Sequence, residues 1–218
     1  MRYKPGEEFS IVEYNKPQEK TVIEEPAHTD VSIYSMGKDT EINAESKPCY
    51  RVLFLHKGKI DAIVKDHTGT REIWKMKERD SMVLPPSLPI AIQAREDSVC
   101  TEILMGEKMH LKIVEAGKPF WIGDLLTYEE GKSVSREVIN SGFITMWIVA
   151  MDKNISTGQN ISTGILIITS IEGEAEMDYE GKTIALHAGK FVLVPKGIHY
   201  EIRTHDQQYK YSVIVEEE

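Results

Sequence analysis

The histidine in the stretch GKFVLVPKGIHYEI, residues 189–202, is the side chain whose type best suits a metal ion. Imidazole nitrogens bind divalent transition metals, but three or four ligands must converge, because a single ligand cannot replace the water that the ion loses. His28, His110 and His187 do not supply such partners, since none has a cysteine, histidine or carboxylate at ligand spacing. The neighbours of His199 therefore decide whether the chain carries metal chemistry.

Other residue patterns that support catalysis are missing from the sequence. There is no glycine-rich phosphate loop, no nucleophile elbow and no pair of carboxylates at a defensible spacing. Metal-free epimerisation needs a base beside an acid, and His199 with Tyr200 or Tyr179 is the candidate pair. Cys49 and Cys100 are too few and too far apart for a zinc ribbon or a disulfide framework, so we expect buried free thiols.

The composition predicts an ordinary soluble globular protein. Of 218 residues, 41% are hydrophobic and 28% charged, and the formal net charge is −9. This acidity disfavours nucleic acid as a partner, because phosphate backbones are bound by clustered Lys and Arg. No apolar run approaches the roughly 18 to 20 residues of a membrane span. The first residues, MRYKPGEEFS, lack the apolar core of a secretory signal, so we expect a cytoplasmic protein without a membrane partner.

Most of the chain alternates between apolar and polar residues, which is typical of β-strands with one buried face. In EAEMDY, Ala175, Met177 and Tyr179 would face inward while the acidic residues between them face water. YKYSVIVE, residues 209–216, shows the same period. The sequence therefore predicts a predominantly antiparallel β fold.

The strands also recur in order. YRVLFLHKGKIDAIVKD, ERDSMVLPPSLPIAIQ and SVCTEILM are echoed by GILIITSIEGEAEMDYEG, HAGKFVLVPKGIHYEI and QYKYSVIVE. Gly58 aligns with Gly173, and Pro86 aligns with Pro195. Because these turn residues coincide at nearly the same spacing, two copies of one β unit are favoured over chance similarity.

The alternation fades between the two copies, where Gly, Pro and charged residues increase. Phe120, Trp121, Leu125 and Leu126 make this stretch too apolar for a free linker, so we expect it to pack across a barrel or against a second subunit, with a short helix. The predicted domains are an N-terminal barrel at 1–115, a connecting segment at 116–138 and a C-terminal barrel at 139–218.

The stretch 189–202 resembles the second motif of the cupin superfamily, in which Gly is followed after five residues by Pro, then by Gly and His. Gly189, Pro195 and Gly197 match the family spacing, and His199 comes one residue early. Together with the repeat, nearly the whole chain resembles a two-domain cupin, or bicupin. Its C-terminal half is similar to the distal, non-catalytic barrel of short phosphomannose isomerases. The resemblance implies an all-β fold of two double-stranded β-helix (jelly-roll) barrels in tandem.

Metal-dependent cupins, as the resemblance implies, hold Fe, Mn, Ni or Zn with two His separated by one residue, a following Glu and the His of the second motif. In the C-terminal copy the first three positions fall on about Asn160, Ser162 and Leu166. None of these is a good ligand for a transition metal. The resemblance therefore predicts no metal beside His199.

In the N-terminal copy the same positions fall on Asn43, Glu45 and Arg51, and the second-motif His falls near Ile90. A guanidinium at the metal position repels a cation. Arg51 and Glu45 could fill the space of the ion as a buried pair. Alternatively, Arg51 could clamp an anionic ligand, because guanidinium binds carboxylate or phosphate through two parallel bonds. A solvated or structural arginine is the third interpretation.

We therefore expect a metal-free bicupin without a cofactor, most simply a homodimer, that binds a small polar molecule such as a sugar or an organic acid, or acts as a structural or sensor module. No catalytic residue is assigned. The alternative is a cupin-type enzyme, either a sugar isomerase or epimerase or a divalent-metal-dependent enzyme. The ligand-binding candidates are His199, Asn160, Ser162, Arg51 and Glu45.

Overall fold

The structure is a computed structural model that describes residues 3–28, 30–65 and 69–216. It confirms the all-β prediction, since the described helices are only α1, Ile11–Tyr14, and the 3-10 turn η1, Ile122–Leu125. The chain divides into two compact units. The N-terminal unit comprises Ile11–Met109 and Val114–Trp121, and the C-terminal unit comprises Met1–Ser10, His110–Ile113 and Ile122–Glu218.

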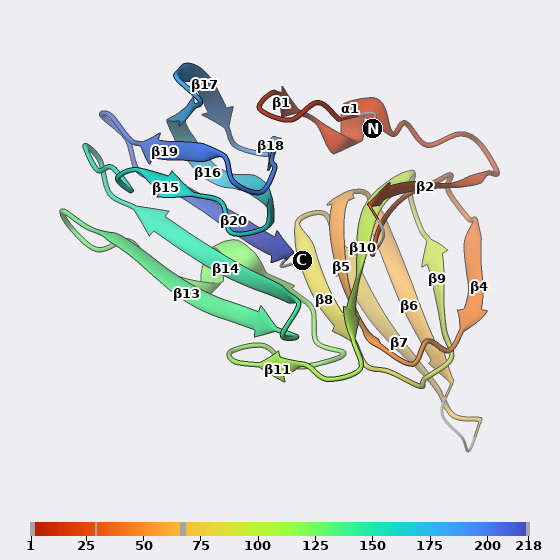
Figure 1. The fold of residues 1–218 in the computed structure, drawn as a ribbon. Helices are drawn as coiled ribbons and strands as arrows, with labels where there is room; N and C mark the ends of the chain where they lie inside the picture. Colours follow the sequence, from red (N-terminus) through yellow and green to blue (C-terminus); the bar gives the residue numbers. More distant parts are fainter. Residues whose placement is uncertain (1–2, 29, 66–68, 217–218) are drawn as a thin grey trace. The chain divides into compact units, whose positions relative to one another are not determined.

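The N-terminal unit consists of two antiparallel sheets, one in the strand order β12-β8-β5-β10-β3-β2 and the other in the order β4-β9-β6-β7 (Figure 1). Its strands are β2 (Val22–His28), β3 (Val31–Met36), β4 (Glu41–Glu45), β5 (Tyr50–Lys57), β6 (Lys59–Lys65), β7 (Arg71–Lys77), β8 (Asp80–Leu84), β9 (Ile90–Ala94), β10 (Ser98–Gly106) and β12 (Phe120–Trp121).

Alternate residues of both sheets form one apolar core in this unit. Leu53 and Leu55 of β5 pack with Ile60 of β6 and Ile92 of β9, and all four are almost fully buried. Successive side chains of a strand point to opposite faces, so the core fixes the direction of every other residue on the same strand. On β5, Arg51 is therefore in phase with the inward-facing Leu53 and Leu55.

The C-terminal unit is built around one long strand, β16, which pairs with strands of both of its sheets. The strands are β1 (Glu8–Phe9), β11 (His110–Leu111), β13 (Ser133–Asn140), β14 (Ile144–Met151), β15 (Asn160–Ile161), β16 (Ile165–Tyr179), β17 (Lys182–His187), β18 (Phe191–Val194), β19 (His199–Arg203) and β20 (Tyr209–Glu216). Its core includes Met151, Met177 and Ile202, each without exposed surface.

A glycine turns the chain from one sheet to the other at the same place in both units. Gly173, with φ +73°, bends β16, and a Cβ there would lie 2.0 Å from the Gln208 carbonyl oxygen. Gly58, with φ +86°, separates β5 from β6, and its Cβ would lie 2.5 Å from the Asp97 carbonyl oxygen. A positive φ and a close backbone approach both require glycine. The two residues aligned by the repeat therefore perform one structural task.

The connecting stretch packs onto the units, as its apolar residues predicted. Phe120 and Trp121 form β12, which pairs with β8. The turn η1 lies against β20, where the buried Lys210 donates to the Gly123 carbonyl oxygen at 2.7 Å. The same ammonium group lies 3.2 Å from Glu172 and 4.7 Å from the ring centroid of Tyr128. One buried charge thus holds this stretch on the C-terminal unit.

The first residues of the chain complete the other edge of the C-terminal unit. Strand β1 pairs antiparallel with β18, and the rings of Phe9 and Phe191 stack with centroids 5.8 Å apart. Glu8 accepts a hydrogen bond from the His187 backbone N–H at 2.6 Å. The edge of β18 is therefore covered by another strand.

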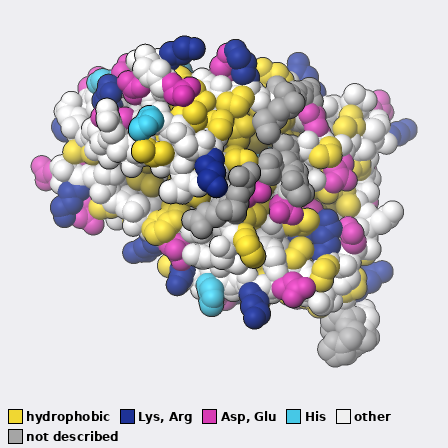
Figure 2. Space-filling view, in the orientation of Figure 1, with side chains coloured by type: hydrophobic (Ala, Val, Ile, Leu, Met, Phe, Trp, Pro, Cys, Tyr) yellow, Lys and Arg dark blue, Asp and Glu magenta, His cyan; other side chains and the backbone are white. Residues whose placement is uncertain are grey.

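Charged side chains of both signs are interspersed on the face shown in Figure 2. No helix among the described residues is both long enough and apolar enough to cross a bilayer.

We predict that Gly173→Ala destabilises the protein by clearly more than Gly189→Ala. Both glycines have a positive φ, which costs an L-residue roughly 1–2 kcal/mol. Only at Gly173 would the new methyl group also collide with backbone, since a Cβ at Gly189 meets nothing within 4 Å. Urea unfolding of the two variants measures the difference, and equal free energies of unfolding would show that the corner tolerates a side chain.

Candidate functional site

Arg51 is a charged residue within the core of the N-terminal unit. It shares the inward face of β5 with Leu53 and Leu55, and only 3% of its surface is exposed. The strand pairing places Arg51 opposite Leu84 of β8 on one side and Leu104 of β10 on the other. A guanidinium group in such surroundings has lost its water and needs hydrogen-bond acceptors from elsewhere.

Glu102 of β10 supplies one of these acceptors. Its Oε1 accepts a hydrogen bond from Arg51 Nη1 at 3.1 Å, and its side chain is 4% exposed. Its other oxygen, Oε2, accepts from Lys47 Nζ at 3.1 Å. Two cationic groups therefore share one buried carboxylate.

The remaining edge of the Arg51 guanidinium has no partner among the described residues. Both Nε and Nη2 are buried without a hydrogen bond. These two N–H groups point the same way from one side of the planar group, which is the fork that matches the two oxygens of a carboxylate. Leaving buried donors unsatisfied is unfavourable by about 1–3 kcal/mol each, and by more in a charged group. The arrangement is therefore suited to an acceptor that the chain itself does not provide.

A hydroxyl cluster adjoins this ion pair. Tyr34 donates to Glu24 Oε1 at 3.0 Å, and its oxygen lies 3.5 Å from Glu102 Oε2. Ser32 donates to the same oxygen of Glu24 at 2.9 Å. Burial, and then the charges of Glu102 and Glu24, raise the pKa of Tyr34 well above its ordinary value. Tyr34 therefore stays protonated and acts as a hydrogen-bond donor.

Glu45 does not face Arg51. Its side chain is 62% exposed and lies 3.7 Å from Lys47 Nζ. Glu45 is three positions from the partly buried Ile42, so strand alternation places it on the opposite face, and it ends β4 opposite Ile90 after a register shift. Sequence reasoning missed Glu102, for which the signal was a lone carboxylate in the otherwise apolar strand SVCTEILM, in phase with the buried Cys100.

The residues at the expected metal positions do not fit a metal ion. Ile90 and Leu166 are buried in the apolar cores of their units, and Arg51 brings a positive charge. In the part of the chain that the structure describes, no three His, Cys, Asp or Glu side chains are grouped to hold an ion. We therefore derive no chemistry through a metal.

His199 lies on the outer face of β19. It is exposed and pairs with Ile161, which is 57% exposed. The next residue, Tyr200, packs against the core of the C-terminal unit, as does Tyr179 opposite it on β16. Because neighbouring side chains on a strand point to opposite faces, His199 shares its face with neither tyrosine. Because His199 comes one residue early in the motif, its side chain lies on the outer face of β19 and not on the face of the two tyrosines.

Ser162 and Asn160 have local hydrogen-bond partners. The buried Ser162 hydroxyl donates to the Pro195 carbonyl oxygen at 2.5 Å and accepts from the Ile198 backbone N–H at 2.9 Å. The Asn160 amide donates to the Gly158 carbonyl oxygen at 2.8 Å. Ser162 thus closes the turn before β19, and Asn160 closes the turn before β15.

Two tyrosine hydroxyls belong to the interior of the C-terminal unit. Tyr211 is 6% exposed, and Tyr200 packs against the same core. Burial, and then the proximity of Tyr200 and Tyr209, raise the pKa of Tyr211. Burial also raises the pKa of Tyr200. Across the described ranges, neither hydroxyl takes part in a hydrogen bond, whereas Tyr209 bonds Ser170 at 2.7 Å.

Comparisons with known proteins bear on the fold. No protein-family model and no curated protein matches the sequence. Among solved structures, the chain is similar to a cupin 2 conserved barrel domain protein from Leptotrichia buccalis, with a TM-score of 0.86 and 18% identity over 100% of this chain and 99% of that one. It is also similar to a deletion mutant of oxalate decarboxylase from Bacillus subtilis, with a TM-score of 0.59 and 14% identity over 100% of this chain and 78% of that one. The chain therefore has the all-β jelly-roll fold of cupin-barrel proteins.

Proposed function

We propose that this chain is a metal-free, non-catalytic protein that binds a small organic acid at Arg51. One observation carries the proposal: the Nε and Nη2 groups of a guanidinium with 3% exposed surface have no acceptor in the described chain. A bound carboxylate would satisfy both donors at once.

The electrostatics of the cluster favour an anion on this edge. Arg51 and Lys47 together carry two positive charges, and the buried carboxylate between them carries one negative charge. Glu45, the other carboxylate that pairs with Lys47, is 62% exposed, so solvent screens its charge. The guanidinium is screened far less, because it is buried.

The surroundings favour a small ligand with a short apolar or neutral body. Leu84 faces Arg51 across the strand pair, and Ile90 lies in the same core. Charged groups beyond one carboxylate would be costly to bury there without further partners. Oxalate decarboxylase, one of the proteins of similar fold, acts by its name on a small dicarboxylate, so oxalate belongs among the ligands to test.

The proposal includes the tandem arrangement. We propose that the chain is a bicupin with two cupin-type barrels, at 1–115 and 139–218, and a connecting segment at 116–138. We also propose that it forms a homodimer. The C-terminal half is proposed to be similar to the distal barrel of short phosphomannose isomerases. The matching glycine corners at Gly58 and Gly173 support the duplication. The opposite faces of His199 and Tyr200 support a non-catalytic assignment, because a base and an acid must reach one substrate.

We predict that acetate or pyruvate raises the melting temperature of the protein more than the dicarboxylates oxalate and malonate do, because a second carboxylate is costly to bury, whereas the neutral acetamide and oxamide have no effect. A ligand that binds only the native state stabilises it, by about 2.7 kcal/mol at a hundredfold excess over Kd. Arg51→Lys keeps the charge but loses the fork, so it should weaken binding about tenfold or more.

Arg203→Lys is the matched control, because Arg203 pairs with Glu201 in the C-terminal unit. It should leave the affinity for the acid unchanged. If no acid binds the native protein in calorimetry, or if Arg51→Lys binds as tightly as the native protein does, the proposal is wrong.

A second prediction separates binding from stability. Glu102→Gln leaves Arg51 buried without its ion pair and should destabilise the protein by about 3–5 kcal/mol. Replacing both partners, Arg51→Met with Glu102→Met, should restore the stability, because a buried ion pair can be exchanged for apolar residues with little loss. The double variant should nevertheless fail to bind any acid. Restored stability with intact binding would exclude the Arg51 site.

The C-terminal unit offers a second candidate function, the binding of a neutral sugar. The supporting observation is the pair of interior hydroxyls on Tyr200 and Tyr211, which are protonated donors. We predict that Tyr211→Phe abolishes any stabilisation by glucose or mannose, while Tyr14→Phe, at a side chain that is 48% exposed, has no effect. A sugar response that survives Tyr211→Phe would refute this assignment, and the melting temperature is the measurement.

A further inference from the structure

A second group of charged residues lies at the other end of the N-terminal unit. Arg51 stands near the start of β5, whereas this group gathers where β6 begins and β7 ends. A groove of about 590 Å³ opens there. Its charged lining residues are Lys59, Lys75, Lys77, Arg95, Asp61 and Asp80.

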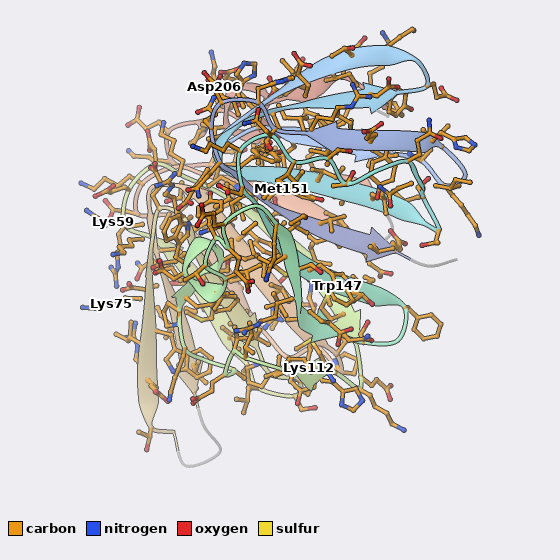
Figure 3. The ribbon with its side chains drawn as sticks, turned by 90° about the vertical axis from the view of Figure 1, so that its left-hand side faces the viewer. Lys59, Lys75, Lys112, Trp147, Met151 and Asp206 are labelled. Carbon is orange, nitrogen blue, oxygen red and sulfur yellow. The ribbon has the colours of Figure 1, made fainter. Side chains whose placement is uncertain are left out.

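The strand pairing places one like-charge pair and one opposite-charge pair at this groove. Lys59 of β6 is directly opposite Lys77 of β7, and Lys75 is opposite Asp61 on the same outward face. Figure 3 shows Lys59 and Lys75 projecting from the same side of the unit. Like charges directly opposite each other on neighbouring strands are destabilising. The Lys59–Lys77 pair is therefore unfavourable by itself, and Glu96 offsets the charge of Lys59.

The two carboxylates of the groove are already engaged. Asp61, which is 6% exposed, accepts from Arg95 Nε at 2.8 Å and lies 2.6 Å from Arg95 Nη2. Asp80 accepts from the Lys77 backbone N–H at 2.8 Å. Hydrogen bonds within the chain thus already compensate part of the negative charge of Asp61 and Asp80.

The ammonium groups differ in what they pair with. Lys59 pairs with Glu96 at 2.5 Å, and both side chains are at least half exposed. Within the described ranges, the side chains of Lys75 and Lys77 have no ion-pair partner. These two groups, on one edge strand of the sheet β4-β9-β6-β7, are available to an external anion.

We propose that this groove binds a small multivalent anion, bearing phosphoryl or carboxylate groups, between the ammonium groups of Lys75 and Lys77 and that of Lys59. The volume lies in the range of small-molecule sites, roughly 300–1,000 Å³. Cations from two strands surround it, so one charge on the ligand would leave the others unmatched. The formal net charge of −9 repels anions in general. An anion must therefore be attracted by the lysines close to the groove and not by the charge of the whole protein.

The test is calorimetric titration of the full chain with pyrophosphate, citrate and acetate at about 20 mM and about 150 mM salt. Pyrophosphate or citrate should bind and acetate should not bind at this groove, with weaker binding at the higher salt. The double variant Lys75→Glu with Lys77→Glu should weaken binding about tenfold or more. Binding of pyrophosphate alone would identify a phosphoryl ligand, and equal binding of citrate would identify any multivalent anion.

The matched control is Lys65→Glu with Arg71→Glu, which makes the same change of net charge on the adjacent strands β6 and β7. Lys65 and Arg71 are also a like-charge pair opposite each other, but neither lines the groove. The control should leave affinity unchanged within about twofold. If it weakens binding as much as the groove variant, or if no multivalent anion binds, the groove is not a site. Arg51→Lys should not alter pyrophosphate binding, so the two sites can fail independently.

Discussion

An extended strand offers each side chain only two directions, and this constraint decides which groups of the chain can meet a ligand. A change of one position on a strand moves a residue from the core to the solvent. Arg51 is in phase with Leu53 and Leu55 and is therefore drawn into the core with them. His199 is out of phase with Tyr200 and Ile202 and is therefore kept outside. Which polar side chains lie inside each unit therefore depends on their position in the alternation of the strand.

The two charged clusters of the N-terminal unit obey different electrostatics. Around Arg51 the charges are buried, so the geometry of the hydrogen bonds matters more than the number of charges. The two unpartnered N–H groups of Arg51 therefore decide which ligand fits. At the groove the lysines are exposed to solvent and act as point charges whose effect falls with salt. On our proposals, the first arrangement selects a ligand by the geometry of its carboxylate and the second selects it by charge. The two proposed anion sites belong to the same unit.

The sequence predicted the β architecture well, because alternation and turn residues are local signals. The glycine corners at Gly58 and Gly173 were found by aligning the chain with itself, and they make equivalent contacts. The partner of Arg51 was not predictable in the same way. Glu102 is 51 residues away, and their meeting depends on the register between β5 and β10, which no local pattern states. Glu45 was misplaced for a related reason, since the pairing of β4 with β9, which fixes where Glu45 lies, cannot be counted from sequence.

The pairing of β1 with β18 has a consequence for how the chain is made. Glu8 and His187 are 179 residues apart, so β1 leaves the ribosome long before the strand with which it pairs has been made. Tyr3 and Phe9, which are stacked against each other in the finished protein, would spend that interval without their final packing. A nascent chain of this kind presents an aromatic, unpaired segment during translation, which is the sort of surface that chaperones bind and that aggregation begins from.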